Sequence, residues 1–280
     1  EAYGAASPVA TLLTVDALPN WLFPRRRNSH KGESGRVLCI GGDHGSGGAI
    51  VLCAEAALRS GAGLVDVATR ELHVPVVLAR RPEVMAHGIE SGEDLEPLLS
   101  RAGAIGIGPG LGQGAWGKAM LRLALASQNP LVLDADALNF LAAAPRVLTD
   151  AILTPHPGEA ARLLGIDTAA VQADRFAAAA AIAVRYEAVT VLKGAGTVIA
   201  APGQLPCVIS AGNPGMAVGG MGDVLTGVIL ALRAQGLSAF DAACAGALLH
   251  SLAGDAAAGD GERGLLPSDL FPHLRRLANP

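Results

Sequence analysis

Short apolar runs alternate with longer helical patterns along most of this chain, and this alternation limits the possible folds more than any other feature. The runs typical of buried strands lie at residues 37–40, 64–68, 84–86, 104–107, 131–133 and 151–153. Helical patterns fit residues 49–59, 72–79, 115–126 and 158–164. Strands that alternate with helices are typical of a parallel sheet with helices on both faces, so the sequence predicts an α/β fold.

The last third of the chain follows a different pattern. Three apolar runs lie close together at residues 189–192, 197–200 and 207–209, and this spacing predicts a small β-meander. Two alanine-rich apolar helices are expected after it, at residues 224–233 and 239–257. No linker and no internal repeat is evident, so we expect an N-terminal extension over residues 1–28 and a single domain over residues 29–280.

Charge and composition argue against nucleic-acid and membrane partners. The net charge is −4 at pH 7, no basic stripe is present, and the run Arg25-Arg26-Arg27 is interpreted as a solvated loop. The uncharged stretch over residues 194–222 is long enough to span a membrane, but its prolines and eight glycines exclude a spanning helix. Four cysteines without close spacing favour a reducing cytoplasm. The chain begins at Glu1, which fits a trimmed N-terminus or a piece of a longer protein.

Glycine-rich or polar segments follow four of the predicted strands. Ligands of parallel sheets bind beyond the carboxyl ends of the strands, so we expect a site where these four loops meet. The segments are residues 41–48, residues 108–112, the group Asp134, Asp136 and Asn139, and the pair His156 and Glu159.

A glycine-rich turn ends the uncharged stretch and leads into an apolar helix. Its 29 residues, 194–222, carry no charged side chain, and Asp223 follows them directly. Glycines before a helix let several backbone N–H groups point at one spot, where the helix dipole adds positive charge, and this arrangement binds phosphate. A carboxylate in such a cradle suits a base that takes a proton from a hydroxyl beside the phosphoryl group. The alternative is a structural turn in which Asp223 caps the helix.

Two other motifs compete with this interpretation. Residues 110–115, with Asp134 at the end of the next strand, are close to the dinucleotide fingerprint G-x-G-x-x-G/A and its ribose-binding acid. They follow a strand in the middle of the predicted sheet, so a redox Rossmann enzyme is the less favoured hypothesis. Residues 112–119 nearly match the phosphate loop G-x-x-x-x-G-K-[ST]. Ala119 replaces the hydroxyl that should hold Mg²⁺, and the lysine lies in a predicted helix, so we reject this motif.

An ordered series of motifs carries a resemblance to a known family. Residues 219–223 resemble the G-x-G-D anion hole of the ribokinase-like superfamily. The whole series is similar to the ADP- or ATP-dependent NAD(P)H-hydrate dehydratases over about residues 30–255. Its other members lie, in order, at residues 30–32, 35–42, 60–65, 81–85, 107–112, 133–139, 154–159 and 192–197.

The resemblance implies a ribokinase-like three-layer α/β/α fold and a repair reaction. In that reaction ADP, or ATP, phosphorylates the hydroxyl that hydration has added to the S-form of NADH or NADPH hydrate, and loss of phosphate restores the reduced cofactor. Asp223 is expected to be the catalytic base. The expected anion hole is Gly219, Gly220, Met221 and Gly222, and the expected nucleotide-binding residues are Lys193, Gly194, Ala195, Gly196, Thr197 and Gly222.

The same resemblance assigns the substrate side and the metal. It places Ala49, Gly110, His156 and Asp223 against the hydrated nicotinamide. Residues 156–159 resemble the N-x-x-E element of the superfamily, in which Glu159 would act through water on the Mg²⁺ of the nucleotide. The alternatives are a structural His156 and a Glu159 that only stabilises the first turn of a helix.

Partners and rival functions complete the expectations. The resemblance implies a homo-oligomer, with a tetramer among its forms, and a functional partnership with an NAD(P)H-hydrate epimerase. A ribokinase-like vitamin or sugar kinase is the second hypothesis, and a nucleotide-binding regulator without turnover is the third. The sequence does not distinguish ADP from ATP, or NADH hydrate from NADPH hydrate.

Overall fold

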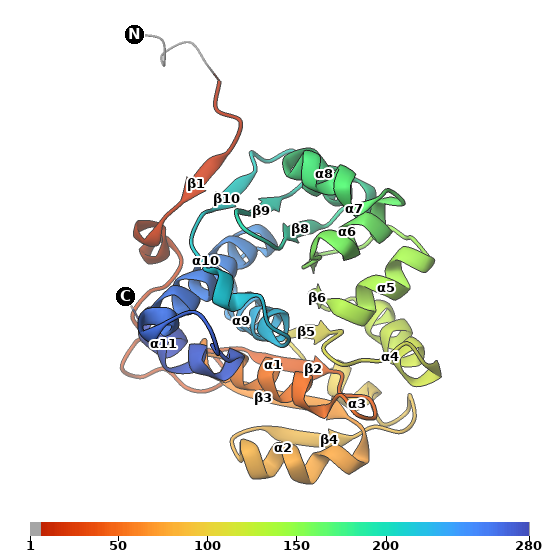
Figure 1. Cartoon of the computed structure of the whole chain (residues 1–280). Helices are drawn as coiled ribbons and strands as arrows, with labels where there is room; N and C mark the ends of the chain where they lie inside the picture. Colours follow the sequence, from red (N-terminus) through yellow and green to blue (C-terminus); the bar gives the residue numbers. More distant parts are fainter. Residues whose placement is uncertain (1–6, 280) are drawn as a thin grey trace.

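The computed structural model describes residues 7–279, and it has one mixed sheet of ten strands between two layers of helices (Figure 1). The order of the strands is β1-β10-β9-β8-β7-β6-β5-β2-β3-β4. The three-layer α/β/α fold expected from the sequence is therefore confirmed. The strands are β1 (Thr11–Leu13), β2 (Arg36–Ile40), β3 (Leu64–Thr69), β4 (Met85–Gly88), β5 (Ala104–Ile107), β6 (Leu131–Leu133), β7 (Ala151–Leu153), β8 (Val189–Leu192), β9 (Thr197–Ala200) and β10 (Cys207–Ile209).

The sheet is buried on both faces because alternate side chains of its strands enter two separate cores. In β2, Val37 and Cys39 enter one core, and Leu38 and Ile40 enter the other. The first core is covered by α1 (Gly47–Arg59), α2 (Val74–Arg80), α9 (Met221–Ala234), α10 (Ala239–Ala257) and α11 (Leu270–Leu277). The second is covered by α3 (Glu96–Leu99), α4 (Ala115–Ala126), α5 (Ala135–Ala143), α6 (Pro157–Leu164), α7 (Thr168–Ala173) and α8 (Arg175–Tyr186).

The direction in which the sheet grows reverses between β2 and β5. The chain runs outward from β2 through β3 to the edge strand β4, and then returns to add β5 on the other side of β2. Such a reversal opens a crevice beyond the carboxyl ends of the two strands, where ligands of α/β proteins bind. The loops over residues 41–46 and 108–114 leave β2 and β5 at this point, so the topology places both glycine-rich segments at one crevice.

The predicted β-meander is confirmed. Strand β9 is antiparallel to β8 and to β10, and β8 joins the parallel part of the sheet through β7. The edge strand β1, which the sequence did not predict, pairs in parallel with β10, so part of the segment before residue 29 belongs to the same sheet. A domain boundary at residue 28 stays a prediction. Within residues 7–279, no helix has the length and apolar character needed to cross a bilayer.

Candidate active site

The N-terminus of α9 has the backbone geometry that the expected anion cradle requires. Gly220 is the N-cap and has a left-handed φ of 97°. A Cβ atom there would lie 2.7 Å from Leu52 Cδ1 and 2.9 Å from Pro267 Cγ, so only glycine fits. The first backbone N–H groups of a helix lack acceptors within that helix, and they face outward with the positive end of the dipole. This end of α9 can therefore hold an anion.

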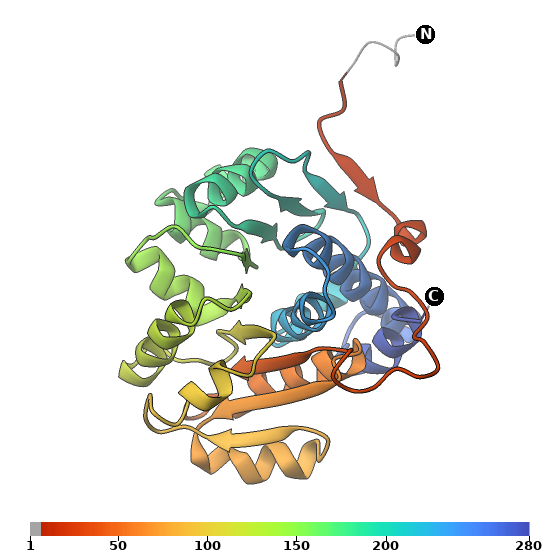
Figure 2. The same ribbon diagram turned by 180° about the vertical axis from the view of Figure 1, so that it is seen from behind.

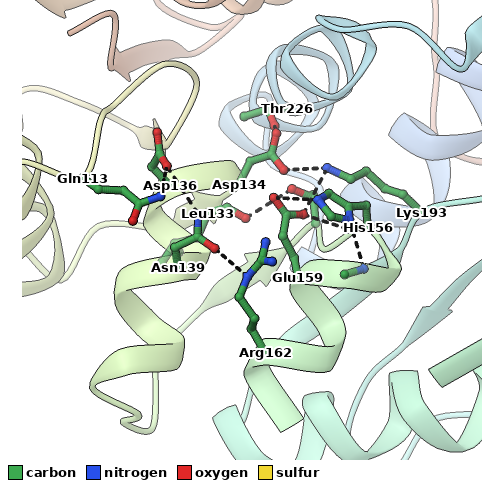
Figure 3. Close-up of polar contacts among 12 residues, drawn as sticks. Gln113, Leu133, Asp134, Asp136, Asn139, His156, Glu159, Arg162, Lys193 and Thr226 are labelled. Atoms are coloured by element: carbon green, nitrogen blue, oxygen red, sulfur yellow. Dashed lines mark hydrogen bonds and ion pairs between the residues drawn. The ribbon is translucent and has the colours of Figure 1, made fainter. Parts of the chain in front are cut away.

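A cluster of charged side chains lies directly in front of this helix (Figure 3). Lys193 Nζ is 2.7 Å from Asp134 Oδ1 and 3.8 Å from Glu159 Oε2, and Thr226 Oγ1 of α9 donates to Asp134 Oδ2 at 3.0 Å. A Cβ atom at Gly222 would lie 3.2 Å from Lys193 Nζ and 3.3 Å from Asp134 Oδ2. The cradle and the cluster therefore form one site.

Asp134 and Lys193 form a buried ion pair at the centre of the cluster. Asp134 is 1% exposed, and the side chain of Lys193 is 19% exposed. Burial is the largest single influence and would raise the pKa of Asp134 and lower that of Lys193. The charge of Lys193 and the hydrogen bonds to Asp134 together outweigh burial at Asp134, and the charges of Asp134 and Glu159 with the hydrogen bond to Asp134 do so at Lys193. The pKa of Asp134 is therefore lowered, that of Lys193 is raised, and both residues are charged at neutral pH.

Asp223 lies in the first turn of α9, beside this pair. Burial raises the pKa of Asp223 to about 7, and the negative charge of Asp134 contributes, while Lys193 opposes the shift. A carboxylate whose pKa is close to the working pH is suited to accept a proton. The capping alternative is less well supported, because Gly220 is the N-cap of α9 and, within residues 7–279, this cap has no side-chain hydrogen bond.

The raised pKa predicts the pH dependence of any reaction in which Asp223 is the base. Below about pH 7 the carboxyl group is protonated and cannot accept a proton, so kcat/KM should rise as the pH increases through about 7. Steady-state rates across this range test the prediction. An acid limb with a pKa near 4 would show that Asp223 keeps its ordinary pKa in the working enzyme.

His156 and Glu159 form a reciprocal cap at the N-terminus of α6. Gly158 N donates to His156 Nδ1 at 3.0 Å, and His156 N donates to Glu159 Oε2 at 2.8 Å. Burial and the nearby charges of Lys193 and Arg162 lower the pKa of His156, so its imidazole is neutral at pH 7. The two structural roles that the sequence left open are therefore present. They do not exclude binding, because the His156 side chain is half exposed.

The turn after Lys193 is held from behind by Arg175, which the sequence did not single out. Arg175 Nη2 donates to the carbonyl oxygens of Leu192, Lys193 and Gly196 at 3.1, 3.4 and 3.2 Å. Arg175 opens α8, and no motif marks it, because its partners are backbone atoms. Residues 194–197 form a tight turn in which Thr197 Oγ1 donates to Gly194 O at 3.1 Å. This turn therefore lies beside the charged cluster, as expected for a nucleotide-binding loop.

The two glycine-rich loops at the crevice are joined to each other. Gly42 N donates to Pro109 O at 3.0 Å, and Asp43 N donates to Gly110 O at 2.6 Å. A Cβ atom at Gly110 would lie 3.1 Å from Ala49 Cβ, so the structure brings these two predicted substrate residues together. Residues 41–49 and 108–110 therefore form one wall of the crevice.

Helices α1 and α9 run parallel, with both N-termini at the same edge of the sheet. A Cβ atom at Gly220 would contact the side chain of Leu52 in α1. Further along α9, a Cβ atom at Gly227 would contact Cys53 O and Ala56 Cβ, which lie further along α1. Ala49 is about one turn from Leu52, so the wall that contains Ala49 and Gly110 lies next to the cradle. The structure thus places the expected substrate side beside the expected anion hole.

Asp136 and Asn139 need a correction, because the sequence analysis placed them in a loop. They lie in the first turns of α5, and they are used to fix other segments (Figure 3). Asp136 accepts from Gly112 N at 2.9 Å, and Asn139 accepts from Arg162 Nε at 2.9 Å. The dinucleotide fingerprint also fails, because Asp134 is buried by its partners and is not free to bind a ribose.

A three-layer α/β/α fold with a glycine-rich anion cradle and an aspartate on the following helix defines the ribokinase-like class. The chain belongs within it to the NAD(P)H-hydrate dehydratase family, whose model matches residues 37–276. It is 41% identical, over 96% of its length and 93% of the relative, to the ADP-dependent (S)-NAD(P)H-hydrate dehydratase of Neisseria meningitidis. A structure of the Bacillus subtilis ADP/ATP-dependent NAD(P)H-hydrate dehydratase, co-crystallised with ATP and Mg²⁺, superposes with a TM-score of 0.84. That likeness has 30% identity and covers 96% of this chain and 97% of the other.

Other relatives are about twice as long. The chain is 56% identical over 92% of its length to the bifunctional NAD(P)H-hydrate repair enzyme Nnr of Coxiella burnetii, of which the match covers 54%. The chain therefore spans about half the length of the first curated relatives that it matches.

Proposed function

We propose that this protein uses ADP, or ATP, to dehydrate the S-form of NADH or NADPH hydrate and so restores the reduced cofactor. The observation that carries the proposal is the position of Asp223, a carboxylate with a pKa of about 7, on the helix that forms an anion cradle. A kinase-type transfer needs these two features in one place, a base for the hydroxyl and a cradle for the phosphoryl group.

In the proposed reaction Asp223 takes the proton of the ring hydroxyl, while the oxygen of that hydroxyl attacks the terminal phosphorus of the nucleotide. The bond between that phosphorus and the bridging oxygen breaks, so with ADP as donor the phosphoryl group is transferred to the ring oxygen and AMP leaves. Backbone N–H groups of residues 219–222 stabilise the transferred phosphoryl group, and Lys193 offsets negative charge beside it. The ring nitrogen then donates its electron pair as phosphate leaves, and loss of a neighbouring ring proton restores the double bond.

The charged cluster fits a hydrated Mg²⁺ that arrives with the nucleotide. Lys193 pairs with two carboxylates, Asp134 and Glu159, and Asp223 adds negative charge when it is ionised, so the cluster attracts positive charge. Among the described residues, no group of three or more His, Cys, Asp or Glu side chains could hold an ion by itself. We propose that Glu159 acts on this ion through water, where the ion would neutralise phosphate charge.

Glu159→Gln should raise the Mg²⁺ concentration needed for half-maximal rate, because a carboxamide attracts hydrated Mg²⁺ poorly. Glutamine can still accept the hydrogen bond from His156 N, so the cap of α6 should survive. Glu96→Gln, which changes an exposed first-turn acid of α3, is the matched control. Equal Mg²⁺ titrations of the two variants and the wild type would leave Glu159 with a purely structural role.

The direct test of the function supplies NADH hydrate, ADP and Mg²⁺ together. The absorbance of reduced nicotinamide should return, with AMP and phosphate formed in equal amounts. His156→Ala should slow this reaction more than it weakens nucleotide binding, because His156 is proposed to contact the substrate. Recovery of absorbance without consumption of nucleotide would contradict the proposal. So would a stable phosphorylated product from a vitamin or sugar alcohol, which is the expected result for the kinase hypothesis.

Three further expectations belong to the same proposal. The bifunctional relatives support a functional partnership with an NAD(P)H-hydrate epimerase. The protein is proposed to act as a homo-oligomer, for which a tetramer is the form to test. All four cysteines are free thiols, which supports a reducing cytoplasm as the location.

A further inference from the structure

A pocket lies at the other end of α1 and α9, away from the candidate active site. Its volume is about 490 Å³, and its lining comes from the ends of these helices, from residues 21–25 and from α11. The segment before β2 and α11 lie beside the ends of α1 and α9 (Figures 1 and 2). We call it the arginine pocket, because its lining includes Arg25, Arg59, Arg81 and Arg275. The proposed reaction uses none of these residues.

The arginine pocket has more positive than negative charge. Its four arginines face two lining acids, Glu55 and Glu83, which leaves two positive charges in excess. Glu55 is 1% exposed and is bound by Arg81, with Arg59 at 3.7 Å. Within residues 7–279, Arg275 is exposed and has no ion-pair partner. A concave surface concentrates the field of such an excess and attracts anions.

The negative ends of the two helix dipoles at this pocket are partly offset by hydrogen-bond donors. Ser60 and Gln235 are the C-caps of α1 and α9. Gln235 Nε2 donates to Ser60 O at 3.1 Å, and Arg25 donates to Gly61 O. The exposed carbonyl groups that would repel an anion are therefore partly covered by donors.

One wall of the pocket contains a buried hydroxyl group that lacks a partner. Ser60 is 2% exposed, and its Oγ has no hydrogen-bond partner in the described part of the chain. Arg81 Nε is also buried and unpaired within residues 7–279. Buried donors that lack an acceptor destabilise a protein, so a ligand oxygen that accepts from them would be bound favourably.

We propose that the arginine pocket binds a small phosphorylated molecule that has an apolar or aromatic part. Guanidinium groups match the oxygen geometry of a phosphoryl group and bind it through paired hydrogen bonds. The volume exceeds that needed for phosphate alone, and Trp21, Leu58 and Leu237 supply an apolar wall. This inference does not depend on the proposed catalytic function.

Trp21 is a natural reporter of binding. The chain has two tryptophans, so Trp116→Phe leaves Trp21 as the single tryptophan, whose emission is measured with excitation selective for tryptophan. Phenyl phosphate, with a dianion and a ring, should change the Trp21 emission saturably and bind more tightly than inorganic phosphate or phenol. Arg275→Glu in this background should weaken binding about 10- to 100-fold, which corresponds to the loss of one charge-assisted hydrogen bond. The charge-matched control, Arg122→Glu on the exposed side of α4, should leave binding unchanged.

Ser60→Ala separates a ligand site from a structural defect. It removes an unpaired hydroxyl, so the free protein should be as stable as the wild type or more stable, while binding of phenyl phosphate weakens. Unsaturable emission, equal affinity in the Arg275→Glu and Arg122→Glu variants, or unchanged affinity in Ser60→Ala would overturn the proposal. So would competition by ADP that persists in Arg275→Glu, because it would place the ligand in the active site.

Discussion

Replacing Asp223 by asparagine is expected to lower turnover by roughly 10²–10⁴-fold, the usual contribution of a positioned base. Asparagine keeps the shape of the side chain but cannot accept the proton of the substrate hydroxyl. The anion cradle consists of backbone groups and does not change, so the affinity for nucleotide should be nearly unaffected. Single-turnover rates and the dissociation constant of ADP, measured on the same preparation, test both parts.

Asp241→Asn is a matched control for this substitution. Asp241 is also a first-turn acid, in α10, where it accepts a hydrogen bond from Trp21 Nε1 at 3.0 Å. If Asp223 only stabilises its helix, the two variants should lose similar stability, and both should keep normal turnover. A large loss of turnover in Asp223→Asn alone, at an unchanged melting temperature, is the result that a catalytic base requires.

The fold was largely predictable because the strands are continuous apolar runs bounded by glycine or polar residues. A run such as residues 37–40 is buried on both faces of a parallel sheet, so its pattern is clear. The helices were harder to predict. Helix α8 contains five consecutive alanines and gives a weak periodic signal. Helix α5 begins at Ala135, which has a left-handed conformation with a φ of 47°. Such a start depends on tertiary contacts and has no marker in the sequence.

The site was predictable where one segment contains both the turn and the functional group. Residues 219–223 are of this kind, since glycines and an acid stand together. The partner of Lys193 was not predictable, because Asp134 lies 59 residues away in the chain, and Thr226 lies 92 residues from Asp134. The run from Arg25 to Arg27 shows the same limit. The solvated loop expected there is confirmed, since all three arginines are exposed, but the sequence could not show that Arg25 also lines a pocket formed with the ends of three helices.

Asp134→Asn is expected to destabilise the protein by about 3–5 kcal/mol, because it leaves the buried ammonium group of Lys193 without its closest counter-charge. Urea-induced unfolding measures this loss. Lys193→Met, combined with Asp134→Asn, removes the orphaned charge as well. The double variant should therefore be more stable than Asp134→Asn alone, by about 1–3 kcal/mol. A double variant less stable than either single variant would show that the two side chains stabilise the fold independently.

The same substitution links the ion pair to the base. The negative charge of Asp134 helps to raise the pKa of Asp223 to about 7, and the positive charge of Lys193 opposes it. Once Asp134 is neutral, its repulsion is lost while the attraction of Lys193 remains. The ionised form of Asp223 is then favoured, so the pKa of Asp223 should fall. The acid limb of kcat/KM should then move to lower pH, even as the maximal rate declines through the disturbed position of Lys193. An acid limb that stays near pH 7 in Asp134→Asn would show that burial alone sets the pKa of Asp223. The buried pair would then position Lys193 without tuning the base.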